Sequence, residues 1–229
     1  MIILVPTCKA YSDAWVPFQA LRKKFWPDCK YPVYIVTDEL PQSGLPVGSY
    51  VVMDKDYGWC WNLRQSIIKY EREEFVLVLQ EDFFFNAAVD NRLVDSALEV
   101  LKQDPRAAMV RLMPCPGPNR PFNDDFGIID YETPYRVSCQ ATIWRKEPLI
   151  RILNQMPTNG TAAHFEIEGS KVKLANWNFY AAYVKHRDRF SYFVSAISRG
   201  QWNPQAVQFC KDNDIPIDTS RRPIEGRPS

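Results

Sequence analysis

The sequence predicts a single α/β domain, in which a mixed, mainly parallel sheet is flanked by helices. Short apolar runs alternate along the 229-residue chain with segments in which apolar residues recur at helical spacing. The run at residues 75–79 is apolar throughout, which is typical of a strand buried on both faces of a parallel sheet. A chain of this length suits one core. We expect the domain to span residues 1–218 and a flexible tail to cover residues 219–229.

The first half of the chain alternates between strands and helices. We expect strands at residues 2–5, 33–36, 49–53 and 75–79. A first helix is expected from an N-cap at Asp13 to residue 24, and a second at residues 59–70. Residues 41–48 are predicted to form a loop. A β-α-β unit of this length is expected to be parallel and right-handed.

The second half begins in the same way and then changes character. A helix is expected at residues 90–103 and a buried strand at residues 107–112. Prolines then mark a long loop at residues 113–125, of the kind kept for function or disorder, and a lid is one use for it. Further strands are expected at residues 126–131, 135–143 and 192–194, and further helices at residues 146–156, 163–169 and 203–210.

The composition narrows the class of protein. With 28 basic and 27 acidic residues the formal charge is +1, so nothing in it predicts nucleic-acid binding. No apolar run approaches the length of a membrane span and no signal sequence opens the chain, so a cytoplasmic protein is expected. The six cysteines form no CxxC pair and only two histidines are present, which argues against a structural zinc site.

Two acids follow the central predicted strand directly. Gln80, Glu81 and Asp82 end the run at residues 75–79, and in an open α/β sheet ligands bind beyond the carboxyl ends of the strands. Oxygen ligands favour a hard cation such as Mg²⁺ or Mn²⁺, which commonly also holds phosphate oxygens of a substrate. The alternative is an acidic loop that does no more than end a core strand.

Several familiar nucleotide-binding and catalytic motifs are absent from the sequence. It has no GxGxxG after the first strand, no GxxxxGK[ST], no GxSxG and no HExxH. These absences argue against a dinucleotide oxidoreductase, a P-loop NTPase, a common type of hydrolase and a zinc protease. The segment Pro6-Thr7-Cys8-Lys9 also lacks the glycines of a nucleotidyltransferase's first loop.

Short motifs of another kind are spread over residues 2–170. They are Val5-Pro6-Thr7, Asp13-x-Trp15-x-Pro17-Phe18, Phe25-Trp26-Pro27-Asp28, Tyr34-x-Val36-Thr37-Asp38, Trp61-x-Leu63, Val76-Leu77-Val78-Leu79-Gln80-Glu81-Asp82-Phe83, Cys139-Gln140-Ala141-Thr142-Ile143-Trp144-Arg145-Lys146 and Phe165-Glu166. Together they resemble the nucleotide-sugar-binding part of a GT-A glycosyltransferase, and in particular the small enzymes of bacterial surface-polysaccharide loci and large DNA viruses.

The resemblance implies an enzyme that transfers a sugar from a nucleoside-diphosphate sugar, most commonly a UDP-sugar, to a saccharide acceptor. It implies Mn²⁺ or Mg²⁺ at Asp82, with Glu81 holding the metal through water or holding the ribose. Thr7 and Asp38 would contact the base and ribose, and Arg64 would reach the diphosphate.

Each of these roles has a plainer alternative. Thr7 and Asp38 also suit turns that end strands, and Arg64 also suits a solvated helix face. The acids form Gln80-Glu81-Asp82 rather than a strict Asp-x-Asp, so metal dependence stays open.

An inverting enzyme needs a carboxylate that takes the proton of the acceptor hydroxyl. Glu166 is the candidate, because GT-A enzymes place acceptor-side groups late in the chain. Glu168 is a rival, and a helix-surface glutamate is the alternative for both. His164 is interpreted as a packing residue, and Asp124 with Asp125 as turn formers.

Aromatic and polar side chains outside the acidic edge complete the candidates. Trp59, Trp61 and Trp144 suit stacking on a sugar or base, or the core. Gln140 and Arg145 suit contacts with the diphosphate or acceptor. Two other functions would use the same fold or edge: a catalytically inactive nucleotide- or carbohydrate-binding protein, and a metal-dependent phosphotransferase or nucleotidyltransferase.

Overall fold

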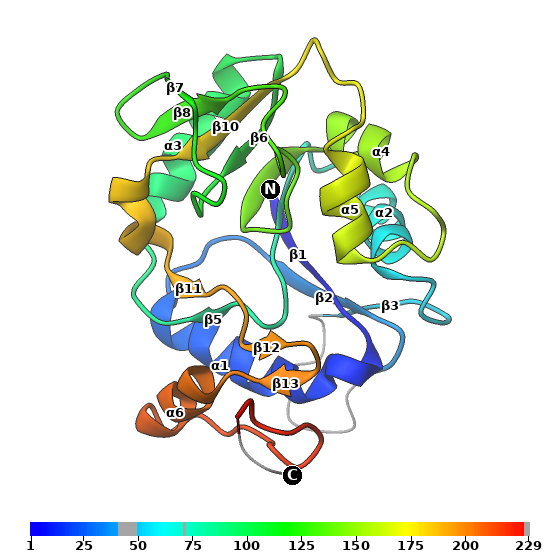
Figure 1. Cartoon of the computed structure of the whole chain (residues 1–229), viewed down its shortest axis with the longest axis vertical. Coiled ribbons are helices and arrows are strands. Elements are labelled where there is room, and N and C mark those ends of the chain that lie inside the picture. The colour runs from blue at the N-terminus through cyan, green and yellow to red at the C-terminus, as the bar shows by residue number, and fades with distance from the viewer. Residues whose placement is uncertain (41–49, 71, 227–229) are drawn as a thin grey trace.

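A central β-sheet runs through the computed structural model, which describes residues 1–40, 50–70 and 72–226 (Figure 1). Within these residues the sheet has nine strands. Four adjacent strands are parallel: β3 (Tyr50–Val52), β2 (Val33–Thr37), β1 (Ile2–Pro6) and β4 (Phe75–Val78). The sheet continues through β9 (Thr142–Arg145), β6 (Ala107–Arg111), β10 (Asn178–Ala182), β8 (Phe126–Ile129) and β7 (Arg120–Pro121).

The direction of the strands confirms the predicted mixed, mainly parallel sheet. β9 runs antiparallel to both of its neighbours, β4 and β6, whereas β6 and β10 are parallel. At the far edge β8 is antiparallel to β10, and β7 to β8. Two small ribbons lie outside this sheet, one of β5 (Phe84–Phe85) with β11 (Tyr192–Phe193) and one of β12 (Ile197–Ser198) with β13 (Gln201–Trp202).

Helices cover both faces of the sheet. On one face lie α1 (Trp15–Phe25) and α3 (Asn91–Gln103), and α6 (Pro204–Asp212) packs beside α1. On the other lie α2 (Trp59–Lys69), α4 (Lys146–Leu153) and α5 (Ala162–Gly169). Ile3 and Val5 of β1 face the first group and Ile2 and Leu4 the second, all fully or nearly buried. Burial on both sides explains why the central strands are apolar without alternation.

Asp13 is not the N-cap of a long helix, so that prediction is wrong. The chain forms a 3-10 helix, η1 (Lys9–Ala14), and α1 starts after it with Ala14 as its N-cap and no side-chain cap bond. The Asp13 carboxylate instead accepts hydrogen bonds from the Arg222 guanidinium at 2.6 and 2.8 Å. Because Arg222 lies far from Asp13 in the sequence, no local pattern indicates this contact, and the short-range pattern suggested an N-cap instead.

The strand predicted at residues 135–143 is also wrong, because regular pairing starts only with β9. Alternate N–H groups donate to side chains rather than to a neighbouring strand: Val137 to Ser170 Oγ at 3.1 Å, Cys139 to Glu166 Oε1 at 2.8 Å and Ala141 to the Tyr192 hydroxyl at 3.0 Å. The extended, apolar-rich sequence is therefore used as a bridge between α5 and the ribbon of β5 and β11.

β10 was not predicted, and it is a central strand between β6 and β8. The remaining predicted helices and strands are present with ends that differ by up to three residues, while the loop predicted at residues 41–48 lies outside the described residues. The helices of the described residues include none that is long and apolar enough to cross a membrane.

The flexibility predicted for residues 219–229 stays a prediction, and residues 227–229 lie outside the described part. Residues 219–226 lie beside β13: Trp202 donates its backbone N–H to the Pro223 carbonyl at 2.9 Å, and Glu225 donates to the Trp202 carbonyl at 2.9 Å. The side chain of Arg222 then reaches the buried Asp13. This segment therefore brings a cation back to the start of the chain.

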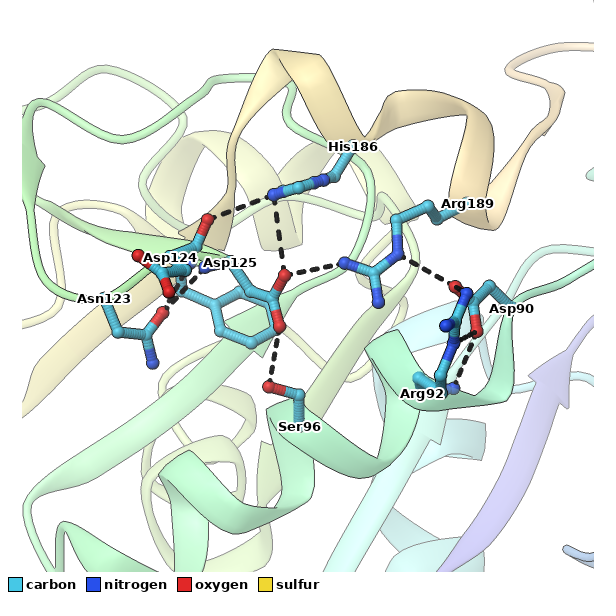
Figure 2. A network of polar contacts seen from close by, with 9 residues as sticks. Asp90, Arg92, Ser96, Asn123, Asp124, Asp125, His186 and Arg189 are labelled. Atoms are coloured by element: carbon cyan, nitrogen blue, oxygen red, sulfur yellow. Dashed lines mark hydrogen bonds and ion pairs between the residues drawn. The ribbon is translucent and has the colours of Figure 1, made fainter.

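A chain of charged contacts ties the end of the 113–125 loop to two other elements (Figure 2). Arg189, in the 3-10 helix η2 (Val184–Phe190), donates to Asp125 at 2.6 Å and to Asp90, the N-cap of α3, at 3.1 Å. Ser96 of α3 donates to the other Asp125 oxygen at 2.9 Å. Figure 2 shows His186 pointing at the same carboxylate, at 3.5 Å.

These contacts shift the ionisation of two carboxyls. Partial burial by itself would raise the pKa of Asp125, but hydrogen bonds from Ser96 and Arg189 outweigh this effect and hold the pKa below its usual value. Hydrogen bonding from Arg92 and Arg189 lowers the pKa of Asp90 to about 2. A carboxyl whose pKa is lower in the folded protein than in the unfolded chain stabilises the fold at any pH above its unfolded value of about 4. This stabilisation is lost as the pH falls from about 4 toward 2.

Replacing Asp125 should therefore cost stability at neutral pH but not in acid. We expect Asp125→Asn to lower the free energy of unfolding by about 1–2 kcal/mol at pH 7, since the Asp125 side chain is largely buried and takes a charge-assisted bond. The loss should shrink at pH 3. Urea unfolding at both pH values measures it. Asp124→Asn is the control, because Asp124 contributes only its backbone carbonyl to His186, and an equal loss in both variants would contradict the assignment.

Candidate active site

A cleft of about 420 Å³ opens at the carboxyl ends of β1 and β4. From β1 the chain passes to β2 on one side, and it later returns to β4 on the other side of β1, so the strand order reverses between these two strands. Open α/β sheets bind ligands at such a switch point. Thr7 follows β1 there, and Gln80, Glu81 and Asp82 follow β4; all four line the cleft.

Two helix N-termini form the wall opposite the acids. Trp59 and Asn62 of α2 line the cleft together with residues 161–163 at the start of α5. Gly58, with φ +101°, permits this approach: a Cβ there would lie 2.8 Å from the Asn159 carbonyl carbon. Asp56 fixes the turn by accepting from the Gly58 N–H at 2.8 Å and from the Asn62 amide at 2.9 Å. The wall is therefore set by backbone contacts that only glycine allows.

Glu81 and Asp82 form a buried pair of carboxylates. Burial raises the pKa of both carboxyls, and the charge of Asp82 raises that of Glu81 further. Glu81 is 8% exposed and accepts a hydrogen bond from the Thr7 hydroxyl, while Asp82 accepts from the Ile197 N–H at 3.4 Å. The ion pairs of the described residues include neither carboxylate. Such a pair is costly unless a ligand compensates it.

Two buried polar atoms at the cleft also have no partner among the described residues. They are the amide nitrogen of Gln80 and the side-chain oxygen of Asn62. The other end of the Gln80 amide accepts from the Trp59 indole at 3.1 Å, and the Trp59 ring packs on Phe165 with centroids 5.2 Å apart. Buried polar groups are nearly always hydrogen-bonded, so an ordered water or a polar ligand is expected to complete these two.

Arg222, which the sequence pattern did not indicate, is a cation whose charge acts on both acids of the pair. Its positive charge lowers the pKa of Glu81 and of Asp82, against the larger effect of burial. The guanidinium is held by Asp13 and lies 4.9 Å from the ring centroid of Tyr11, which lines the cleft. To predict its role from the sequence, one would have had to pair an arginine of the C-terminal tail with Asp13, an acid near the first strand.

The structure brings Thr7, Glu81 and Asp82 together, and places Asp38 just beyond the cleft. Asp38 follows β2 and accepts from the Lys9 N–H at 2.8 Å, at the start of η1. Burial raises the pKa of the Cys8 thiol to about 11, and the charges of Asp56, Glu81 and Asp38 contribute. These three acids therefore surround the end of β1, although Asp38 is absent from the cleft lining.

Arg64 and Glu166 are placed away from the cleft lining. Arg64 lies on α2, hydrogen-bonded to Asn154 at the end of α4 and stacked on Trp61. Glu166 lies one turn beyond the cleft-lining residues of α5, where one carboxylate oxygen accepts from the Cys139 N–H at 2.8 Å. It lines a second depression instead. Its rival Glu168 forms an exposed ion pair with Lys171.

The other candidates divide between the cleft and the scaffold. Trp59 lines the cleft, whereas Trp144 is buried in the core against Phe165 and Phe179. His164 completes a capping box with Thr161 at the start of α5. Gln140 accepts from the Tyr192 hydroxyl at 2.9 Å, and Arg145 binds backbone carbonyls of residues 101 and 107. These last three have structural partners.

The acidic pair suits a divalent cation that takes its remaining ligands from elsewhere. Among the described residues no group of three or more His, Cys, Asp or Glu side chains is placed to hold a metal alone. Mg²⁺ and related ions are commonly bound by one or two carboxylates together with substrate phosphates. The uncompensated charge of Glu81 and Asp82 suits such an ion.

Comparison with known proteins establishes the fold only. No protein-family model and no curated protein matches the sequence. Among solved structures, S. aureus TarS is similar with a TM-score of 0.51 and 15% identity over 80% of this chain, and the chain spans 35% of the TarS length. Two others are the CMP:2-keto-3-deoxy-manno-octonic acid synthetase complexed with CTP (TM-score 0.42, 11% identity, 79% of this chain and 88% of that one) and a glycosyltransferase involved in glycosylation of the major capsid of PBCV-1 (0.35, 13%, 72% and 74%). The likeness to TarS shows a GT-A-like α/β fold.

Removing one member of the acidic pair should stabilise the metal-free protein. The raised pKa of Glu81 means that its ionisation opposes folding above the unfolded pKa of about 4.3. We expect Glu81→Gln to raise the free energy of unfolding by about 1–2 kcal/mol at pH 8 in EDTA and to change it little at pH 4. Chemical unfolding at both pH values checks this.

Asp56→Asn provides the matched control at the same cleft. The Asp56 carboxylate already accepts two hydrogen bonds, so this variant should be less stable than the wild type. A Glu81→Gln protein that is no more stable than the wild type at pH 8 would contradict the charge assignment.

Proposed function

We propose that the protein is a glycosyltransferase that moves a sugar from a nucleoside-diphosphate sugar to a saccharide acceptor. The observation that carries the proposal is the cleft at the β1–β4 switch point, into which an unpaired carboxylate pair projects. The GT-A-like fold is consistent with it, although a fold alone does not fix an activity. A UDP-sugar is the favoured donor, by analogy with the common donors of such folds.

The cleft offers groups for each part of a donor nucleotide. Trp59 and Tyr11 provide aromatic surfaces, and the free amide nitrogen of Gln80 and oxygen of Asn62 provide a donor and an acceptor for polar edges. Thr7 and Asp38, at the ends of β1 and β2, are assigned to the base and ribose. Arg64, bonded to Asn154, would reach a diphosphate only after leaving that partner, so we assign it no contact with the cleft's ligand in this conformation.

Asp82 and Glu81 are assigned to a divalent cation, Mn²⁺ or Mg²⁺. When bound, the cation neutralises the negative charge that gathers on the departing diphosphate. Asp82 would hold it directly, while Glu81 would hold it through water or hold the ribose. Arg222, through Asp13, supplies a fixed positive charge near the same edge.

Glu166 is assigned as the general base of an inverting transfer. The acceptor hydroxyl loses its proton to the Glu166 carboxylate, and its oxygen forms a bond to the anomeric carbon of the donor. The bond from that carbon to the diphosphate oxygen breaks, and the electron pair leaves with the nucleoside diphosphate. Glu166 keeps one oxygen on the Cys139 N–H, which fixes the orientation of the carboxylate and leaves the other oxygen for the proton.

Binding of UDP and of GDP, each with and without Mn²⁺, tests the donor site by calorimetry. We expect one nucleotide to bind in a metal-dependent way, and Asp82→Asn to weaken that binding by about a hundredfold. Asp54→Asn is the control, because its exposed carboxylate contacts Tyr57 and does not line the cleft.

Each result has a defined meaning for the proposal. Binding that depends on neither Mn²⁺ nor Asp82 would contradict the metal assignment, and failure of both nucleotides to bind would contradict the function itself. Slow release of free UDP from a UDP-sugar distinguishes a transferase from an inactive binding protein, and release of pyrophosphate would indicate a nucleotidyltransferase.

Glu166→Gln should reduce the rate of transfer while leaving nucleotide affinity unchanged. The amide still accepts the Cys139 N–H but cannot take a proton, so we expect kcat to fall by about 10²–10⁴-fold. Glu168→Gln, on the same helix, should keep the wild-type rate because Glu168 forms an exposed ion pair with Lys171. Equal losses in the two variants, measured as nucleotide released with an acceptor present, would exclude Glu166 as the base.

A further inference from the structure

A second depression, of about 400 Å³, is lined by Glu166. One wall is the turn at residues 131–135, and the other is the face of α5 and its end that carries Glu166, Ile167, Ser170 and Lys171. Its volume is in the range of ordinary ligand pockets. It shares α5 with the first cleft, because residues 161–163 of that helix line the cleft and the following turn lines the depression.

Large apolar side chains are exposed in this depression. Tyr135 is 50% exposed, Ile167 48% and Tyr131 37%. They stand beside the carboxylates of Glu132 and Glu166. A pyranose ring has one apolar C–H face and a rim of hydroxyls, so flat tyrosine rings next to carboxylate acceptors match it on both counts.

The turn is held rigid by two buried arginines. Arg111, at the end of β6, donates to the carbonyls of Pro116 at 2.8 Å, Tyr135 at 3.2 Å and Arg136 at 2.6 Å. Arg136 donates to the carbonyls of Ser170 at 2.9 Å and Val172 at 3.1 Å, and stacks 4.0 Å from the ring centroid of Tyr131.

Burying these two cations is costly, because neither has an acidic ion-pair partner among the described residues. Burial lowers the pKa of Arg111 to about 10. In return, the hydrogen bonds of the two arginines fix the turn at residues 131–136 against α5.

Tyr135 itself is held in a strained conformation. Its φ is +56°, in the left-handed region that a non-glycine residue rarely occupies. The ring of Tyr135 is half exposed. A strained residue that presents an aromatic ring outward is typical of a binding site.

We propose that this depression binds a pyranose ring of the acceptor saccharide, with Tyr135 as its main stacking surface and Glu132 and Glu166 as partners for its hydroxyls. The inference rests on the proposed transferase function, because it treats Glu166 as the base that the acceptor must reach. It adds a location for the acceptor that the donor cleft does not provide.

Saturation-transfer NMR tests the site with glucose, galactose, N-acetylglucosamine, rhamnose and maltose as probes. Tyr135→Asn removes the ring, and asparagine tolerates the left-handed backbone, so the turn should stay folded. We expect at least one sugar to bind the wild type and its affinity to fall by about tenfold in Tyr135→Asn. Tyr135→Phe should retain binding, because it keeps the stacking surface.

Phe122→Asn is the matched control, since Phe122 is another exposed aromatic side chain (47%) that does not line the depression. An equal loss in this variant, or no saccharide signal from the wild type, would overturn the inference and leave an exposed apolar surface better suited to a protein partner. UDP and GDP binding in the same samples separates the two claims. If a nucleotide binds but no sugar binds in a Tyr135-dependent way, the saccharide site in the depression is refuted and the donor site is retained. If a sugar binds in a Tyr135-dependent way but no nucleotide binds, the transferase function is refuted and the saccharide site is retained.

Discussion

The pairing of β1 with β4 is the contact on which the proposed donor site depends. Ile2 lies opposite Val76 and Leu4 opposite Val78, and the Leu79 N–H donates to the Leu4 carbonyl at 3.0 Å. Both strands are buried on two faces, so a slip of one residue would exchange the side chains that pack against the two helix layers and disrupt both cores. The register is therefore fixed, and it sets the polar residues after β1 beside the acids after β4.

From that contact the two sites follow in order. The fixed strand ends leave a carboxylate pair in a partly enclosed cleft, where burial raises both pKa values and a cation or a charged ligand would be favoured. α5 connects this cleft with the depression beside Glu166, so one helix links the place assigned to the donor with the place assigned to the acceptor. The pairing of β1 with β4 fixes the backbone that presents the side chains of the cleft. In the same way, hydrogen bonds from the buried Arg111 fix the backbone that presents the side chains of the depression.

Much of the fold was predictable because it depends on local pattern. The apolar run at residues 75–79 identified the central strand, and the acids that follow it do line the cleft. Features set by contacts distant in sequence were missed or mistaken. The Asp13 carboxylate binds Arg222 instead of capping a helix, and the N–H groups of the segment at residues 135–141 bind side chains of α5, its C-cap Ser170 and β11 instead of a neighbouring strand. No short-range periodicity encodes such partners.

The central claim is that the cleft between the ends of β1 and β4 binds a nucleoside diphosphate together with a divalent cation. A crystal structure of the protein with Mn²⁺ and UDP, and a second with GDP, recorded at the manganese absorption edge, tests it most directly. We predict an anomalous peak bonded to a carboxylate oxygen of Asp82, with the diphosphate of one nucleotide on its other side. Nucleotide bound elsewhere on the molecule, with no manganese at Glu81 or Asp82, would contradict the claim.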